Sequence, residues 1–266
     1  MADGDVLLAG SHLTKTYRPR GLSRRAAARP AVDDVSFEVR AGQTLGVVGE
    51  SGSGKSTLCR MAMRLVEPDS GTVTVCGRDI TRLRGRDLKD VRPLVQMVFQ
   101  NPFSSFDPLV RLDLSLAEPL VQYGLARGSD EIRARLEGLA SECGLAPELL
   151  GRYPGELSGG QLQRMAIVRA LCMAPRVLVA DEVVSALDVV VQDEVLTLLE
   201  RLVRERGMGM LLVSHDLAVI RRVSSHVIVM REGRLVDEGS VDHIFRESSV
   251  PYTRQLVSAI PSLPRG

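Results

Sequence analysis

Alternating hydrophobic and polar positions open the chain and predict β-strands. Residues 6–17 and 32–39 alternate in this way, and an arginine-rich stretch joins them. Residues 71–77, GTVTVCG, alternate again between two glycines. A side-chain period of two residues is typical of a strand with one buried face, so we expect strands at these three places.

Four further runs are more continuously apolar and indicate buried strands. They cover residues 44–48, 94–99, 176–180 and 208–214. A helical run follows the first of them at residues 58–65. A second amphipathic helix is expected after the third, with an apolar face formed by Val191, Val195, Leu198, Leu199 and Leu202. Strands that alternate with helices predict an α/β fold.

The character of the sequence changes to helical between residues 112 and 173, where no strand-like run occurs. Apolar residues recur here at spacings of three and four, which places them on one helix face. They are Ile132, Leu136, Leu139, Ala140 and Cys143. We therefore expect a helical subdomain inserted into the α/β core.

The C-terminal part predicts a hairpin, a short helix and a tail. Residues 226–230 and 234–238 flank Glu232-Gly233, a turn signal, and a short helix is expected at 241–246. Together these patterns predict one domain over residues 5–260, with an α/β core at 5–111 and 174–240, a helical subdomain at 112–173 and a C-terminal tail at 241–266.

Composition is that of an ordinary globular protein, with 44% hydrophobic and 25% charged residues among 266. A net charge of +1 gives no general attraction to nucleic acid, so no nucleic-acid partner is expected. One stretch is locally basic, and it is either a solvated loop or a contact with anionic lipid or an acidic partner. Its residues are Arg18, Arg20, Arg24, Arg25 and Arg29.

Cysteine spacing and hydropathy favour the reducing cytosol. No C-x-x-C pair occurs, so neither a zinc site nor a disulfide framework is predicted. No run approaches the roughly 18 apolar residues of a membrane-spanning helix, and no export signal is visible near the N-terminus.

A glycine-rich loop, here called the P-loop, follows the apolar run at 44–48 and matches G-x-x-x-x-G-K-[ST] in full. Its residues are Gly49, Glu50, Ser51, Gly52, Ser53, Gly54, Lys55, Ser56 and Thr57. Such loops wrap backbone N–H groups around a phosphate chain at a helix N-terminus, and the lysine adds a full charge. The Ser56 hydroxyl is placed to bind Mg²⁺. The alternative, a simple glycine-rich turn, leaves the lysine unexplained.

Two carboxylates, Asp181 and Glu182, follow the apolar run at 176–180, and His215 follows the one at 208–214. At the carboxyl end of a strand the backbone turns, so both carboxylates can reach one pocket. Phosphate hydrolysis requires one carboxylate that binds Mg²⁺ and one that activates the attacking water. A solvated loop is the alternative for this pair when it is taken alone.

A second anion site is predicted at Leu157-Ser158-Gly159-Gly160-Gln161, which opens a helix carrying residues 164–171. Ser158 can cap this helix, and the two glycines expose its first backbone N–H groups. A plain helix cap is the alternative.

The order of these motifs resembles the ATP-binding cassette of ABC transporters over residues 7–260. The resemblance implies a P-loop core with an N-terminal antiparallel β subdomain and an inserted helical subdomain. It also implies that Tyr17 stacks on adenine and that Ser56, Gln100 and Asp181 bind Mg²⁺. Glu182 then resembles the general base. Gln100 and His215 resemble the catalytic residues that contact the γ-phosphate.

The same resemblance gives the LSGGQ segment a role in a dimer. In this family the segment faces the γ-phosphate bound by a second cassette, so Ser158, Gly159, Gly160 and Gln161 contact ATP across an interface. Asp188 resembles the residue that links the two sites. The implied partner is a second ABC ATPase, identical or different.

Residues 99–106 and 251–256 resemble the peptide and nickel importer branch more closely. Its members work at the cytoplasmic face of the membrane with two transmembrane permease subunits and an extracytoplasmic solute-binding protein. Phe103 and Phe106 are then either docking residues for a membrane subunit or core residues. The predicted function is ATP hydrolysis that drives import of a peptide or similar small solute.

One departure concerns the catalytic carboxylates. Where the family usually has Pro-Thr, this chain has Val183-Val184, so the loop that holds Glu182 is expected to be less fixed. Two alternatives stay open: a soluble ATPase of DNA repair or translation, and a degenerate regulatory cassette. The first usually carries a coiled-coil insertion or two cassettes, which this chain lacks.

Overall fold

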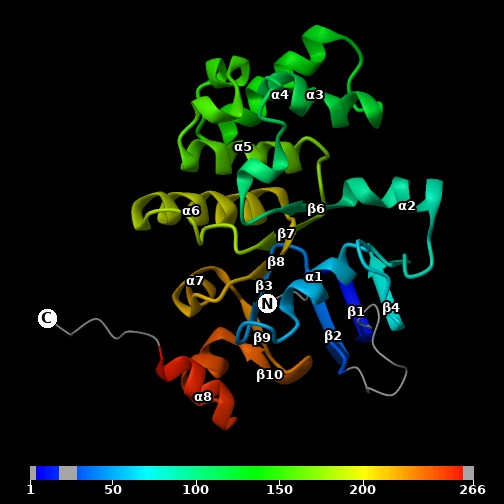
Figure 1. Cartoon of the computed structure of the whole chain (residues 1–266), viewed down its shortest axis with the longest axis vertical. Helices are drawn as coiled ribbons and strands as arrows, with labels where there is room; N and C mark the ends of the chain where they lie inside the picture. The colour runs from blue at the N-terminus through cyan, green and yellow to red at the C-terminus, as the bar shows by residue number, and fades with distance from the viewer. Residues whose placement is uncertain (1–3, 18–28, 260–266) are drawn as a thin grey trace, which may run out of the picture.

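The computed structural model describes residues 4–17 and 29–259. This part of the chain forms two β-sheets and helices that pack around them (Figure 1). The arginine-rich stretch at Arg18, Arg20, Arg24 and Arg25 lies outside the described residues, as does the end of the predicted tail at 260–266.

The central sheet brings together strands from both halves of the chain. It contains β3 (Thr44–Val48), β6 (Val95–Val98), β7 (Val177–Asp181), β8 (Gly209–Val213), β9 (His226–Arg231) and β10 (Arg234–Ser240). Their order is β10-β9-β3-β8-β7-β6, and only β10 runs antiparallel to its neighbour. Every residue of β3 and β8 is buried, which confirms that these apolar runs are buried strands.

The alternating N-terminal segments form a second, antiparallel sheet. It contains β1 (Val6–Lys15), β2 (Val32–Arg40), β4 (Ser70–Val75) and β5 (Arg78–Asp79) in the order β2-β1-β4-β5. The inner face of this sheet shares one hydrophobic cluster with helix α1 (Lys55–Ala62) and the central sheet, including Phe37, Met61 and Ile228. The predicted N-terminal antiparallel subdomain is confirmed.

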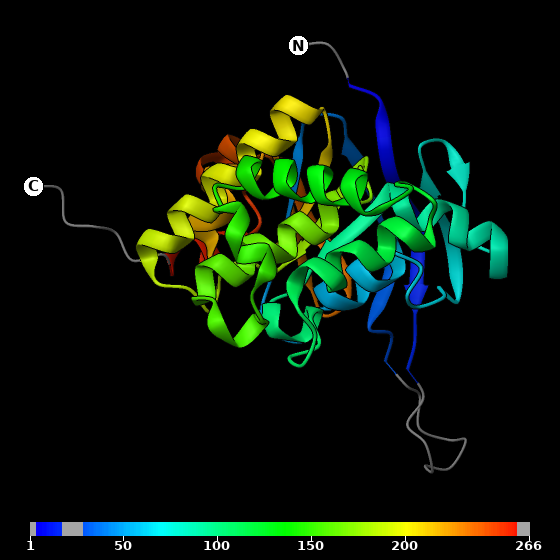
Figure 2. The same ribbon diagram turned by 90° about the horizontal axis from the view of Figure 1, so that it is seen from above.

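The inserted helices lie at the end of the molecule away from β1 and β2 (Figures 1 and 2). They include α3 (Leu112–Gln122), α4 (Ser129–Glu142) and α5 (Gly159–Leu171). Residues 112–173 are all described and contain no strand, so the helical insertion is confirmed. Of its predicted apolar face, Leu136, Leu139, Ala140 and Cys143 are buried and Ile132 is partly buried. The exact boundaries at 112 and 173 stay predictions.

Several elements differ from the sequence pattern. Helix α2 (Gly85–Val91) was not predicted, and α8 (Pro251–Ser258) forms within the predicted tail. The short helix expected at 241–246 is present: residues 241–242 are α-helical, and a π-helix, His243–Glu247, continues from them. Helix α7 (Leu217–Val223) follows β8. The predicted hairpin is confirmed between β9 and β10, where Glu232 and Gly233 adopt φ of 52° and 85°.

A charged contact joins the helical insertion to α6 (Val189–Arg206). The Arg206 Nε donates to a carboxylate oxygen of Glu142 at 2.8 Å, and both side chains are 29% exposed. This hydrogen bond is the main reason why the pKa of Glu142 lies below its usual value. Arg201 also donates to the backbone carbonyl of Glu142. The end of α4 is therefore fixed to α6 at two points.

We expect Glu142→Gln to lower the free energy of unfolding at pH 7 by about 0.5–1 kcal/mol, because the pair is partly shielded from water. The folded-state pKa is lowered, so this contribution is full above the unfolded pKa of about 4.3 and is lost as pH falls through the lower folded value. Urea unfolding of both proteins at pH 7, 5 and 4 measures it. Glu137→Gln, in a more exposed pair with Arg133 on the same helix, is the control. A gap that is independent of pH would contradict the assignment.

Candidate functional site

The P-loop begins at the end of the buried strand β3 and closes on the first turn of α1. Two of its glycines are required by close approaches of backbone. A Cβ on Gly49 would lie 2.1 Å from the Met230 carbonyl oxygen, and one on Gly54 would lie 2.2 Å from that of Ala31. Both residues have positive φ, at 148° and 105°. Only glycine fits these positions, so the loop conformation follows from the sequence.

A cavity of about 400 Å³ opens above the loop. Residues from the P-loop and the start of α1 form one wall, and helix N-termini favour anions through their unpaired N–H groups. The opposite wall comes from the ends of β7 and β8. The cavity is lined by Ala31, Ser51, Gly52, Gly54, Lys55, Ser56, Thr57, Glu182 and His215. A larger cavity of about 670 Å³ lies near Phe37, Thr44 and His226, away from these groups.

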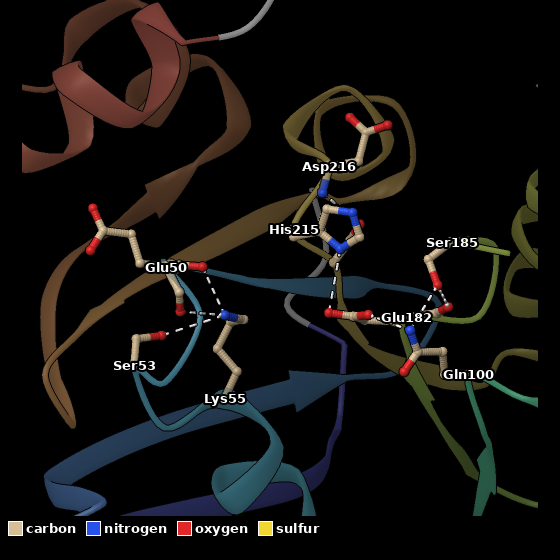
Figure 3. Close-up of polar contacts among 10 residues, drawn as sticks. Glu50, Ser53, Lys55, Gln100, Glu182, Ser185, His215 and Asp216 are labelled. Atoms are coloured by element: carbon tan, nitrogen blue, oxygen red, sulfur yellow. Dashed lines mark hydrogen bonds and ion pairs between the residues drawn. The ribbon is translucent and has the colours of Figure 1, made fainter.

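Lys55 is folded back onto the loop that precedes it. Its Nζ donates to the carbonyl oxygens of Gly49 at 2.7 Å and Glu50 at 2.8 Å (Figure 3). The residue is only 7% exposed, and this burial lowers the pKa of its ammonium group, against the opposing effect of Glu182 and Asp181. Neutral carbonyls are weaker partners for a buried cation than a phosphate oxygen. The site therefore favours an anion beside Lys55.

Asp181, at the end of β7, lies close to Ser56 of the P-loop. Burial, followed by the nearby charge of Glu182, raises the pKa of Asp181, and the Ser56 side chain opposes this shift. Carboxylate and hydroxyl oxygens are the ligand types that Mg²⁺ prefers, so this pair fits the cation. The described residues contain no cluster of three or more His, Cys, Asp or Glu suited to a metal. A bound phosphate would have to complete such a site.

Glu182 lies at the centre of a polar network (Figure 3). Its carboxylate accepts a hydrogen bond from Gln100 Nε2 at 2.8 Å and lies 3.4 Å from His215 Nδ1. Ser185 accepts a second bond from Gln100 at 3.2 Å and donates to the Glu182 carbonyl at 3.0 Å. The structure thus brings Gln100, Glu182 and His215 together as predicted. It turns Gln100 toward Glu182 and not toward the Ser56 and Asp181 pair.

Ser185 is a polar residue of this site that the sequence patterns did not indicate. Its hydroxyl bridges Gln100 and the backbone of Glu182, two segments 82 residues apart. The sequence did contain one indication of this role: Ser185 follows Glu182 by three residues, a spacing at which a hydroxyl can donate to the backbone carbonyl.

The LSGGQ segment lies apart from the P-loop cavity of its own chain, since none of its residues lines that cavity. Ser158 caps α5 by accepting from the Gln161 N–H at 3.3 Å, and Gln161 accepts in return at 3.0 Å. A Cβ on Gly160 would lie 2.4 Å from Val191, which shows how closely α5 approaches α6. Ser158 and Gly159 are exposed. One chain therefore presents this helix start to the outside.

Asp188 and Tyr17 are also outside the described lining of the cavity. Asp188 caps α6 by accepting from the N–H groups of Val190 and Val191 at 3.1 and 3.0 Å. Tyr17 is 47% exposed at the edge of the described N-terminal segment. Their roles in linking sites and in stacking on adenine stay predictions.

A buried parallel strand, a P-loop and carboxylates at the end of a neighbouring strand together define a P-loop nucleoside triphosphatase. The family model described as ABC transporter matches residues 32–185. The chain belongs to this family, and its class is that of an ATPase. No helix among the described residues is long and apolar enough to cross a bilayer.

Curated relatives support the family over nearly the whole chain. The oligopeptide transport ATP-binding protein OppF of Haemophilus influenzae is 39% identical over 97% of this chain and 79% of its own length. The glutathione import ATP-binding protein GsiA of Pectobacterium atrosepticum is 42% identical over 98% of this chain. The chain spans only 42% of the length of that relative.

Solved structures agree with the fold. The dimeric post-hydrolysis cassette MJ0796, bound to ADP and Pi, matches with a TM-score of 0.78 and 28% identity, covering 88% of this chain and 99% of that one. The cassette cbiO1 of Clostridium perfringens matches with a TM-score of 0.79 and 26% identity, covering 91% and 92%.

The Val183-Val184 departure has a structural counterpart. Both valines are buried, at 1% and 3% exposure, and the Ser185 N–H donates to the Glu182 carbonyl at 3.1 Å. Packing therefore holds this loop where the family usually has proline. Glu182 itself has a φ of 51°, in the left-handed region. A following proline disfavours the α region for the residue before it, and valine at position 183 places no such restriction on Glu182.

We expect Val183→Pro to change ATP turnover severalfold and to leave nucleotide affinity within about twofold, because proline would restrict the backbone of Glu182 and leave the P-loop unchanged. Turnover at saturating Mg-ATP and the dissociation constant of ADP measure the two effects. Val183→Ala, which removes packing but leaves the backbone free, separates the contribution of the side chain. Unaltered turnover in the proline variant would show that the loop tolerates both residues.

Proposed function

We propose that this chain is the ATP-binding and ATP-hydrolysing subunit of an ABC importer for peptides or a similar small solute. The observation that carries the proposal is the single cavity lined by the P-loop, Glu182 and His215. The solute class rests on relatives whose names describe oligopeptide transport and glutathione import. Both relatives align with almost the entire chain.

In this proposal the P-loop residues 49–57 bind the phosphates of ATP, and Lys55 exchanges its loop carbonyls for phosphate oxygens. Ser56 and Asp181 would hold Mg²⁺, together with Gln100 once its side chain turns from Glu182. Mg²⁺ bound there would neutralise charge that builds up on the phosphates.

Glu182 is the proposed general base. Its carboxylate accepts a hydrogen bond from Gln100 and lies near His215. When these two side chains turn to the γ-phosphate, the carboxylate becomes free to accept a proton from the attacking water.

A second cassette, identical or different, would complete each site. The start of α5 at Ser158 and Gly159 is exposed and lies outside the P-loop cavity of its own chain. Head-to-tail pairing would place this segment, with Gly160 and Gln161, on the γ-phosphate of the partner. Asp188 would then lie at the interface.

Two transmembrane permease subunits and an extracytoplasmic solute-binding protein are the other proposed partners, with the chain at the cytoplasmic face of the membrane. A groove of about 300 Å³ beside Gln100 offers a docking surface for the permease, with Leu65 and Phe99 on its wall. Phe103, 51% exposed, is the candidate anchor near it. Phe106 is only 6% exposed and packs under Arg169, so of the two alternatives for this residue the structure favours the core.

The alternative functions gain no support. A soluble ATPase of DNA repair or translation does not fit the relatives, which are named as transport and import proteins. A degenerate regulatory cassette depended on Val183-Val184, yet both valines are packed in the core beside an intact Glu182 network.

We expect Glu182→Gln to lower ATP hydrolysis by roughly a hundredfold or more, because the amide cannot accept the proton from water. Unhydrolysed ATP should then trap a dimer in Mg-ATP. Size-exclusion chromatography with light scattering measures it. The exposed Glu205→Gln on α6 is the matched control and should behave as wild type. A strictly monomeric Glu182→Gln protein in excess Mg-ATP would count against the proposed pairing.

We expect the tagged chain, extracted gently from its native membranes, to copurify with two integral membrane proteins. The Phe103→Asp variant should lose these partners, because burying a charge in an apolar groove is costly. Mass spectrometry identifies the partners, and retained ADP binding shows that the variant is folded. Recovery of the wild type only from the soluble fraction, with ribosomes or DNA, would exclude the transport function.

A further inference from the structure

The C-terminal helix α8 contacts the P-loop through one side chain. The Tyr252 hydroxyl accepts a hydrogen bond from the backbone N–H of Glu50 at 3.1 Å. These residues are 202 positions apart in the sequence. Figure 1 shows α8 beside β9 and β10 at the lower end of the molecule.

Tyr252 is fixed in place by its surroundings. The residue is 5% exposed, and the Arg231 guanidinium lies over its ring at 4.8 Å from the centroid. The next residue, Thr253, is 1% exposed and donates to a carboxylate oxygen of Asp237 on β10 at 2.7 Å. The hydroxyl is thus presented to the P-loop by a side chain that cannot easily turn away.

The peptide group between Gly49 and Glu50 is held on both sides. Its N–H donates to Tyr252, and its carbonyl oxygen, that of Gly49, accepts from Lys55 Nζ at 2.7 Å. A peptide group is planar, so its N–H and C=O directions are set together. Tyr252 therefore determines the direction of a carbonyl that binds the phosphate-binding lysine.

The β9–β10 hairpin fixes the remainder of the loop. The Gly233 N–H donates to the Ser53 carbonyl at 3.0 Å, and the Met230 carbonyl leaves no room for a side chain at Gly49. The peptide between Gly49 and Glu50, at the start of the loop, instead donates its N–H to Tyr252 of α8. This makes the loop dependent on a helix outside the nucleotide-binding core.

We propose that Tyr252 is a positioning residue for the nucleotide site, and that α8 pre-organises the P-loop for phosphate. The proposal rests on the proposed function, since it assumes that the P-loop binds nucleotide. Tyr252 does not line the cavity. Its effect passes through the orientation of the Gly49–Glu50 peptide, which shapes the start of the loop whether Lys55 donates to the Gly49 carbonyl or to a phosphate, so it favours binding and not the chemical step.

Tyr252→Phe removes the hydroxyl and keeps the ring under Arg231. We expect the dissociation constant of Mg-ADP for the full chain to rise about fivefold, equivalent to about 1 kcal/mol at 25 °C, with turnover at saturating ATP unchanged. The KM for ATP should rise in parallel. In the free protein the Glu50 amide should exchange its hydrogen faster, which reports directly on the lost bond.

Ser258→Ala is the matched control, because it removes a hydroxyl from the same helix that bonds only within α8. Its ADP affinity should equal that of the wild type. A purely structural role of Tyr252 would lower the melting temperature with unchanged ADP affinity, and this result would overturn the proposal. Failure of the wild type to bind ADP at all would instead overturn the proposed function, and this inference with it.

Discussion

The site depends on a buried positive charge whose closest partners are neutral. Lys55 is almost fully enclosed, and its ammonium group donates to two carbonyls of the loop that surrounds it. Burying a cation is costly unless strong partners replace water. The buried strand β3 and the backbone approaches at Gly49 and Gly54 hold the lysine there nonetheless. The surrounding fold is thus arranged so that an anion relieves an existing electrostatic cost when it binds.

Strand order explains why the catalytic groups meet. The strands β6, β7 and β8 are adjacent and parallel, so their carboxyl ends meet at one edge of the sheet. Gln100 comes shortly after β6, Glu182 directly after β7 and His215 shortly after β8. Segments more than 30 residues apart in the sequence therefore converge without any single motif that contains them. The helical insertion between β6 and β7 leaves this convergence intact.

Local patterns predicted the parts of this protein that local physics determines. Apolar runs gave the buried strands, and the P-loop conformation follows from glycines at positions where a Cβ would clash. The contacts of Ser185 and Tyr252 were not predictable in this way, because each depends on a partner at least 85 residues distant. Phe106 shows the same limit, since two phenylalanines three residues apart look alike until packing buries one of them. Residue type indicated the chemistry of a position, but tertiary packing decided which of two similar residues is buried and which is exposed.

The exposed start of α5 has a consequence for when such a cassette hydrolyses ATP. Its LSGGQ segment lies away from the cavity that holds Lys55, so in the proposed arrangement no chain carries both halves of one complete site. A solitary chain would then retain nucleotide without consuming it. Hydrolysis would depend on the encounter of two cassettes and would rise steeply with their local concentration. Bringing two cassettes together on one membrane assembly would therefore both raise the rate and confine ATP consumption to assembled transporters.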